Sequence, residues 1–188
     1  MLTFDMISQA AKRLQDVVNR TPLFESPLLN NTLGFRLLIK SECLQKTGSF
    51  KIRGAYNMIA SLNAKQREAG VVAYSSGNHA QGVAMAAQKL NVKAAIVMPR
   101  TTPQIKVDAV RNRGARVVLH GDSFEEAAAH ARKLVEEKAM TYVHPFDDPD
   151  VIAGQGTIGM EIVRQHQQPL DALFVPVGGG GLLAGVAA

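Results

Sequence analysis

Four consecutive glycines, Gly178, Gly179, Gly180 and Gly181, lie between an apolar run at residues 172–178 and the start of a predicted helix. No side chains cover their backbone N–H groups, and a helix N-terminus adds roughly half a positive charge. Such a nest binds a phosphate group. A tight turn is the alternative, but a turn needs one or two glycines rather than four. The motif matches neither the dinucleotide pattern G-x-G-x-x-G nor a P-loop, so the phosphate should belong to a ligand other than NAD or ATP.

Lys51 is the second candidate for chemistry. It lies in the first turn of a helix predicted over residues 50–62, for which Ser49 is the expected N-cap. The charged form of a lysine is disfavoured at a helix N-terminus, which lowers the pKa and favours an amine nucleophile or base. Taken alone, however, Lys51 is better read as an ordinary surface lysine, and composition gives Lys40 and Lys46 the same claim.

The third candidate is the loop Ser75-Ser76-Gly77-Asn78-His79, which follows an apolar run at residues 71–76. Hydroxyls and exposed backbone N–H groups at the end of a strand and the start of a helix suit a carboxylate. A cluster that only caps the next helix is an equally good reading of these residues alone, since Asn78 would suffice for that.

Apolar runs that alternate with helical patterns predict an α/β fold, with a parallel sheet covered by helices on both faces. Ligands bind such sheets at the carboxyl ends of the strands, and the three loops lie at or beside those ends. Residues 21–27 contain two prolines and are predicted to be an irregular connector. The predicted strands are 35–42, 71–76, 94–99, 116–121, 141–144 and 172–178, and the predicted helices are 5–19, 50–62, 79–90, 103–114, 123–138 and 150–166.

Composition narrows the classes of partner. The 188 residues carry a net charge of +5, but the basic residues are scattered and there is no Trp, so we expect no nucleic-acid partner. Residues 172–188 are uncharged, yet Pro176 and the four glycines argue against a membrane span. One cysteine, Cys43, excludes an internal disulfide, and the N-terminus does not have the pattern of a signal peptide. A cytoplasmic location is therefore expected.

Four segments together resemble the threonine dehydratase and serine racemase branch of the fold-type II pyridoxal-phosphate enzymes. They are SECLQKTGSFKIRGAYN, SSGNHAQGVA, VIAGQGTIGMEI and PVGGGGLLAG. The resemblance implies a tryptophan-synthase-β-like fold, with parallel twisted sheets covered by helices. Residues 1–52 would begin the larger domain, residues 53–148 would form the smaller domain, and residues 149–188 would return to the larger one. The family's catalytic core is longer than this chain, so we expect the larger domain to be incomplete at its C-terminal end.

The resemblance also implies roles for the three loops around the cofactor, pyridoxal 5'-phosphate. Lys51 would hold the cofactor as a Schiff base and remove the substrate α-proton, and Phe50 would pack beside the cofactor ring. Asn78 would hydrogen-bond the ring hydroxyl, and Gly178 to Gly181 would cradle the phosphate. The substrate carboxylate would be bound by the loop of Ser75, Ser76, Gly77, Asn78 and His79.

The implied activity is dehydration and deamination of L-threonine, and of L-serine, to 2-oxobutanoate or pyruvate and ammonia. This reaction belongs to isoleucine biosynthesis, and the family suggests a homo-oligomer, either a dimer or a tetramer. Ser76 leaves a second activity open, because racemases carry a serine there as the acid-base opposite the lysine. A truncated, non-catalytic domain that binds pyridoxal phosphate is another alternative. A generic nucleotide-binding domain is disfavoured because no acidic ribose partner is suitably placed.

Several other polar residues are expected to have structural roles. Asp147 and Asp148 precede Pro149 and predict a turn and a helix cap. Gln155 and Thr157 should serve packing and hydrogen bonding, and the spacing of the remaining histidines does not suggest a metal site.

Overall fold

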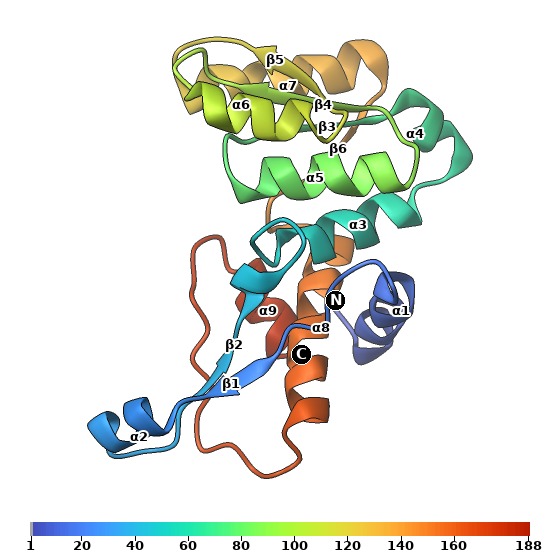
Figure 1. Cartoon of the computed structure of the whole chain (residues 1–188). Helices are drawn as coiled ribbons and strands as arrows, with labels where there is room; N and C mark the ends of the chain where they lie inside the picture. Colours follow the sequence, from blue (N-terminus) through green and yellow to red (C-terminus); the bar gives the residue numbers. More distant parts are fainter. Residues whose placement is uncertain (1) are drawn as a thin grey trace.

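The computed structural model describes residues 2–188 and shows an α/β protein in two parts. The upper part in Figure 1 contains a four-stranded parallel sheet, and the lower part contains helices and a two-stranded antiparallel sheet. The strand order of the larger sheet is β5-β4-β3-β6, with β3 at Val71–Tyr74, β4 at Ala94–Met98, β5 at Arg116–Leu119 and β6 at Thr141–Tyr142. All four strands lie within residues 53–148, the segment expected to form the smaller domain, and the division itself stays a prediction.

Alternating residues of these strands are buried on opposite faces of the sheet, which is why the strands read as continuous apolar runs. Val71 and Ile96 belong to one hydrophobic cluster, together with residues of α5 and α6. Val72 and Val97 belong to another, together with residues of α7. Helices therefore cover both faces, as predicted. Their bounds are Asn78–Lys89 for α5, Gln104–Arg111 for α6 and Phe124–Lys138 for α7.

The lower part is organised around α8 (Pro149–Gln165), which packs against α1, α3 and α9 (Figure 1). These three helices span Phe4–Leu14, Lys51–Ser61 and Gly181–Val186. Asp148 caps α8 by accepting a hydrogen bond from the Val151 N–H at 3.0 Å, as predicted. A buried ion cluster and close glycine contacts, described below, hold this part together.

The segment between residues 21 and 44 differs from the prediction. Its supposed connector contains β1 (Leu23–Glu25), which pairs antiparallel with β2 (Leu38–Lys40) and so shortens the strand expected at 35–42. Between them, α2 (Pro27–Leu33) begins at the Ser26 cap and ends at Gly34, whose φ is +74°. Prolines at 22 and 27 thus mark the start of a short strand and of a helix rather than irregular structure. A 3-10 turn, η1, follows at Glu42–Leu44.

The strand predicted at 172–178 is wrong, because these residues form no strand in the structure. Phe174 is 88% exposed and Leu173 is 50% exposed. An apolar run becomes a strand only when a neighbouring strand accepts its backbone hydrogen bonds, and among residues 2–188 none does so here.

Three smaller features also differ from the prediction. The helix expected at 5–19 ends at Leu14, and α4 (Ala64–Ala69), with a capping box between Asn63 and Gln66, was not predicted. Ser49 is not the N-cap of α3. The cap position belongs to Phe50, and the buried Ser49 Oγ has no hydrogen-bond partner in the described chain.

Candidate functional site

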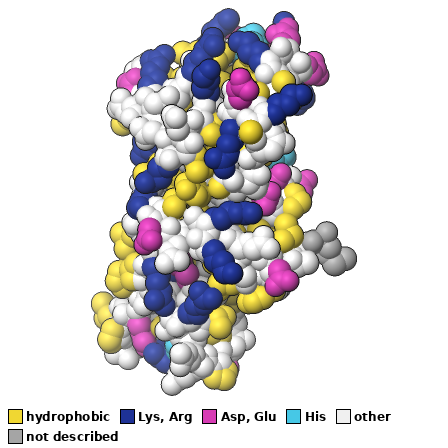
Figure 2. Space-filling model, turned by 90° about the vertical axis from the view of Figure 1, so that its right-hand side faces the viewer, with side chains coloured by type: hydrophobic (Ala, Val, Ile, Leu, Met, Phe, Trp, Pro, Cys, Tyr) yellow, Lys and Arg dark blue, Asp and Glu magenta, His cyan; other side chains and the backbone are white. Residues whose placement is uncertain are grey.

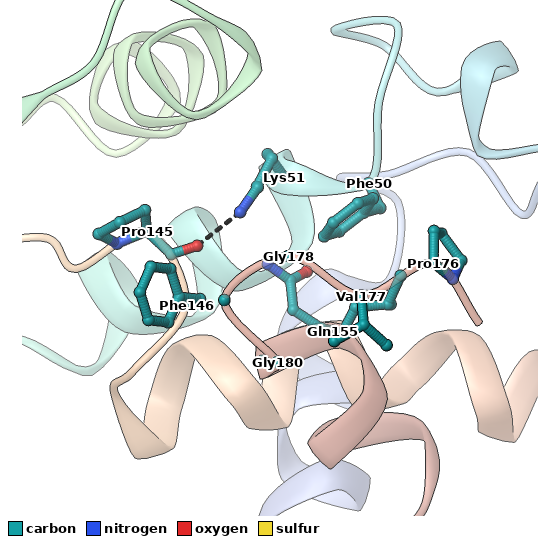
Figure 3. Close-up of a pocket in the computed structure, with 12 residues that line it drawn as sticks. Phe50, Lys51, Pro145, Phe146, Gln155, Pro176, Val177, Gly178 and Gly180 are labelled. Carbon is teal, nitrogen blue, oxygen red and sulfur yellow. Dashed lines mark hydrogen bonds between the residues drawn. The ribbon is translucent and has the colours of Figure 1, made fainter.

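A cavity of about 330 Å³ lies where the start of α3, the segment before α8 and the glycine loop meet (Figure 3). It brings together the first two of the three candidate loops, which are more than 120 residues apart in sequence. Its lining consists of Phe50, Lys51, Pro145, Phe146, Gln155 and residues 176–182.

Lys51 is half-buried at the first position of α3, and its amine points across the cavity toward the Pro145 carbonyl (Figure 3). The Lys51 Nζ donates a hydrogen bond to that carbonyl at 2.6 Å and lies 5.3 Å from the centre of the Phe50 ring. Burial lowers the pKa of Lys51, which raises the share of uncharged amine. Of the three lysines with equal claims by composition, Lys51 alone lines this cavity: Lys46 is exposed, and Lys40 is ion-paired with Glu161.

The glycine loop forms the opposite side of the cavity. A side chain on Gly178 or Gly180 would meet nothing within 4 Å, so both positions face open space. A side chain on Gly179 would instead overlap the Phe146 ring, and one on Gly181 would overlap the Phe146 carbonyl. Within residues 2–188, the N–H groups of these four glycines donate no hydrogen bond. The loop therefore offers free donors to a ligand on a backbone that only glycine can bring so close to Phe146.

The loop of residues 75–79 lies at the carboxyl end of β3 and does not line this cavity. It leads into α5, which begins at Asn78 and packs beside Lys51: a side chain on Gly82 of α5 would come within 3.0 Å of the Lys51 backbone. The Gly77 N–H donates to the Ser75 Oγ at 3.2 Å, and the Ser76 and Thr102 hydroxyls are 2.9 Å apart. Asn78 is exposed.

His79 is buried, and its Nε2 lies 2.9 Å from the Val143 carbonyl. Burial, together with the nearby Lys51 charge, lowers the pKa of His79 to about 4. Its ring is therefore neutral near pH 7 and donates to Val143, which leaves only its backbone to serve a carboxylate.

A buried ion cluster behind Lys51 was missed by sequence reasoning. Arg53 is fully buried and donates to both carboxylate oxygens of Glu42 at 2.8 Å and to Glu161 Oε1 at 2.6 Å. Lys40 donates to the other oxygen of Glu161. Burial raises the pKa of Glu161, but the hydrogen bonds from Arg53 and Lys40 outweigh burial and leave it below its usual value. The available signal was two polar residues four positions apart on one face of the helix, Arg53 and Asn57, both of which are fully buried.

Two residues of α8 have the structural roles that the sequence predicts. The Gln155 side chain accepts a hydrogen bond from the Gly54 N–H at 3.2 Å. The Thr157 hydroxyl donates to the Gly154 carbonyl at 2.7 Å and accepts from Arg53 at 3.2 Å. In the part of the chain that the structure describes, no three His, Cys, Asp or Glu side chains are grouped so that they could hold a metal ion. No helix within residues 2–188 is long and apolar enough to cross a membrane.

Residues 14–188 match the family described as pyridoxal-phosphate dependent enzyme. The chain belongs to this family. It is 56% identical over 176 residues to a biosynthetic chloroplastic threonine dehydratase of Arabidopsis thaliana, a match that covers 94% of this chain and 30% of the relative. It is 52% identical to an L-threonine ammonia-lyase of Thermotoga maritima, with 99% of this chain and 46% of the relative covered. The chain thus spans less than half the length of these relatives.

Solved structures give the same fold. The processed threonine deaminase isoform 2 of Solanum lycopersicum superposes with a TM-score of 0.93 at 51% identity, covering 98% of this chain and 51% of that one. Maize serine racemase superposes with a TM-score of 0.95 at 39% identity, covering 99% of this chain and 56% of that one. The fold-type II assignment made from the motifs is confirmed.

The residues present fit pyridoxal phosphate. The cavity offers an amine of lowered pKa on one side and a glycine loop with free N–H donors on the other, and the Phe50 ring lines it beside Lys51 (Figure 3). An aldehyde carbon needs such an amine, a phosphate needs such donors, and an aromatic ring packs well against another ring.

Proposed function

We propose that the protein carrying this chain dehydrates and deaminates L-threonine to 2-oxobutanoate and ammonia, and L-serine to pyruvate and ammonia. One observation carries the proposal. The Lys51 amine and the four glycines line one cavity, in a chain 52–56% identical to proteins named threonine dehydratase or threonine ammonia-lyase.

The chain's own residues would divide the work as follows. The N–H groups of Gly178 to Gly181 would bind the cofactor phosphate, and the Phe50 ring would pack beside the cofactor ring. Asn78 would hydrogen-bond the ring hydroxyl, and residues 75–79 would bind the substrate carboxylate. When bound, pyridoxal phosphate supplies an electron sink for the bond broken at the substrate α-carbon.

Lys51 would have two tasks. Its amine would hold the cofactor covalently and, once displaced by substrate, would take the α-proton. Burial lowers the pKa of Lys51 and so favours the uncharged amine that both tasks need. The β-hydroxyl leaves as water, one water returns in hydrolysis, and the net products are a 2-oxo acid and ammonia.

Serine racemisation is the second candidate function, and Ser76 is the observation that favours it. The Ser76 hydroxyl would be the acid-base, and maize serine racemase shares the fold at 39% identity. The Ser76 Oγ is 2.9 Å from the Thr102 Oγ1, so its direction is fixed by a second hydroxyl. We place dehydration first because relatives at 52–56% identity are named threonine dehydratase or threonine ammonia-lyase.

An assay of the protein at its full length tests both functions. L-threonine should yield 2-oxobutanoate and ammonia in equal amounts, and Lys51→Ala should reduce the rate by about 10²–10⁴-fold or more. Ser76→Ala should leave elimination intact and abolish any formation of D-serine from L-serine. A protein that binds the cofactor at Lys51 but releases neither product would be the non-catalytic domain instead.

We also propose that the protein acts in the cytoplasm as a homo-oligomer, a dimer or a tetramer, on free amino acids. Support for the location comes from the composition and from bacterial relatives named as biosynthetic threonine dehydratases, although plant relatives are named as chloroplastic. The oligomeric state is what the family resemblance implies. Light scattering of the purified protein gives the oligomeric state, and a monomer would contradict this part.

A further inference from the structure

We propose that His144 is a positioning residue for Lys51: its imidazole closes a turn that presents the Pro145 carbonyl to the Lys51 amine. The inference rests on the role proposed for Lys51. It concerns a side chain that does not line the cavity and that the sequence motifs did not single out.

The turn is closed by two hydrogen bonds to one nitrogen. The Nδ1 of His144 accepts the N–H of Asp147 at 2.7 Å and the N–H of Phe146 at 3.3 Å. An imidazole nitrogen accepts only when it carries a lone pair, so this geometry requires a neutral ring with its hydrogen on Nε2. The arrangement resembles the turns in which an Asn or Asp side chain accepts N–H groups two and three residues later.

Aromatic neighbours hold the imidazole in place. Its ring makes edge-to-face contacts with Tyr142, at 5.7 Å between centres, and with Phe146, at 4.7 Å. Tyr142 in turn stacks on Tyr74 of β3 at 5.9 Å. The Nδ1 is therefore aimed by packing that begins in the parallel sheet.

The residues inside this turn touch both walls of the cavity. The Pro145 carbonyl accepts from the Lys51 Nζ at 2.6 Å, and Phe146 packs directly on Gly179 and Gly181. Within residues 2–188, Pro145 is the only hydrogen-bond acceptor of the Lys51 amine. Loss of the turn would therefore free the amine from its single partner and loosen the contact with the glycine loop.

Two variants separate the acceptor from the ring. His144→Asn keeps an acceptor of N–H groups and loses the aromatic ring, whereas His144→Phe keeps an aromatic ring and loses the acceptor. If the acceptor positions the Pro145 carbonyl, only His144→Phe should change the titration of Lys51 and its reaction with pyridoxal phosphate.

The first readout needs no cofactor. The titration of Lys51 is followed from about pH 6 to pH 11 by trace acetylation and peptide mass mapping, in the protein at its full length. His144→Phe should lower the midpoint of Lys51 by about one pH unit, the size of one hydrogen bond to a charged group. His144→Asn should match the wild type, and the exposed Lys46 should not move in either variant. The neighbouring His79 is neutral in this range because its pKa is lowered to about 4.

The second readout separates this inference from the proposed function. Loss of the turn also loosens the contact of Phe146 with the glycine loop, which weakens cofactor binding by more than the extra uncharged amine favours it. Borohydride reduction after addition of pyridoxal phosphate should therefore give about tenfold less adduct on Lys51 in His144→Phe than in His144→Asn at the same subsaturating cofactor concentration. No adduct on wild-type Lys51 would refute the cofactor role, while the acetylation titration would still test His144. An unchanged Lys51 midpoint in a folded His144→Phe variant would overturn the inference, and so would a shift of equal size in His144→Asn.

Discussion

The wall that carries Lys51 and the wall that carries the glycine loop face each other across one cavity, but different forces hold them. Behind Lys51, Arg53 is fully buried and ion-paired with Glu42 and Glu161, and α5 of the sheet part packs on α3. The glycine loop follows an exposed segment, in which Phe174 is 88% exposed, and its helix α9 has only six residues.

The glycine wall, which consists of the glycine loop and α9, is held by the close approach of the α9 backbone to the α8 backbone. A side chain on Gly156 of α8 would come within 2.6 Å of the Gly185 carbonyl of α9, and a side chain on Gly159 would come within 3.2 Å of the Val186 carbonyl. Backbones that touch in this way gain dispersion contacts and allow no added atoms. The lysine wall is thus fixed by buried charge, and the glycine wall by the absence of side chains.

The largest expected effect concerns the lysine wall. Arg53→Met should reduce the free energy of unfolding by about 3–5 kcal/mol, because Glu42 and Glu161 would keep their charges without their main partner. Urea unfolding of the two proteins measures the difference. Arg36→Met is the matched control, since the Arg36–Glu25 pair is on the surface and its removal should change stability little. Equal effects of the two variants would mean that the cluster does not anchor the wall.

Acid should weaken the same wall through Glu161. Because the pKa of Glu161 is lowered in the folded protein, its contribution is present above the usual carboxyl range and is lost as the pH falls through the lowered value. The wild type should therefore exceed Glu161→Gln in stability near pH 7, by less than the effect of Arg53→Met, since Arg53 keeps Glu42. As the pH is lowered from 7 to 3, the free energies of unfolding of the two proteins should converge. A difference in the free energy of unfolding that stays constant with pH would contradict the role assigned to Glu161.

The glycine wall should respond to a single methyl group. Gly156→Ala should cost about 1–3 kcal/mol, because α9 must move away from α8 to admit the side chain. Gly178→Ala meets nothing within 4 Å and should leave thermal stability nearly unchanged. If both substitutions were equally harmless in thermal unfolding, close helix contact would not be what positions the loop.

The smallest effect is expected beyond the carboxyl ends of the two central strands, β3 and β4. Thr102→Val removes the hydroxyl that pairs with Ser76 and should cost about 0.5–1.5 kcal/mol. Thr102→Ser keeps the hydroxyl and should retain most of that stability in the same thermal unfolding measurement. A loss from Thr102→Ser as large as that from Thr102→Val would show that the methyl group, rather than the hydroxyl pair, matters here.

The same contrast explains what the sequence could predict. Strands between residues 71 and 142 were predictable because their neighbours are in the described chain and cover both faces. The run at 172–178 has the same apolar character but no partner strand among residues 2–188. Its apolar composition therefore led to the wrong prediction of a strand. The glycine loop was predicted from residue type and spacing. Lys51 was singled out through the family resemblance, since residue type alone gave Lys40 and Lys46 the same claim. The Arg53 cluster was not predicted, because Arg53 reaches Glu161 across 108 residues of sequence. The turn at His144 is local, but its link to the site is the contact of Lys51 with Pro145, which lie 94 residues apart.

The central claim is that Lys51 and the glycine loop together form a site for pyridoxal phosphate. Its most direct test is the visible absorption spectrum of the purified protein with added pyridoxal phosphate, before and after borohydride reduction, followed by peptide mapping of the label. We predict one reduced adduct, on Lys51, that is lost in Lys51→Ala and strongly reduced by excess inorganic phosphate competing for the glycine loop. An adduct spread over Lys46 and other exposed lysines, or no adduct in a folded protein, would contradict the account.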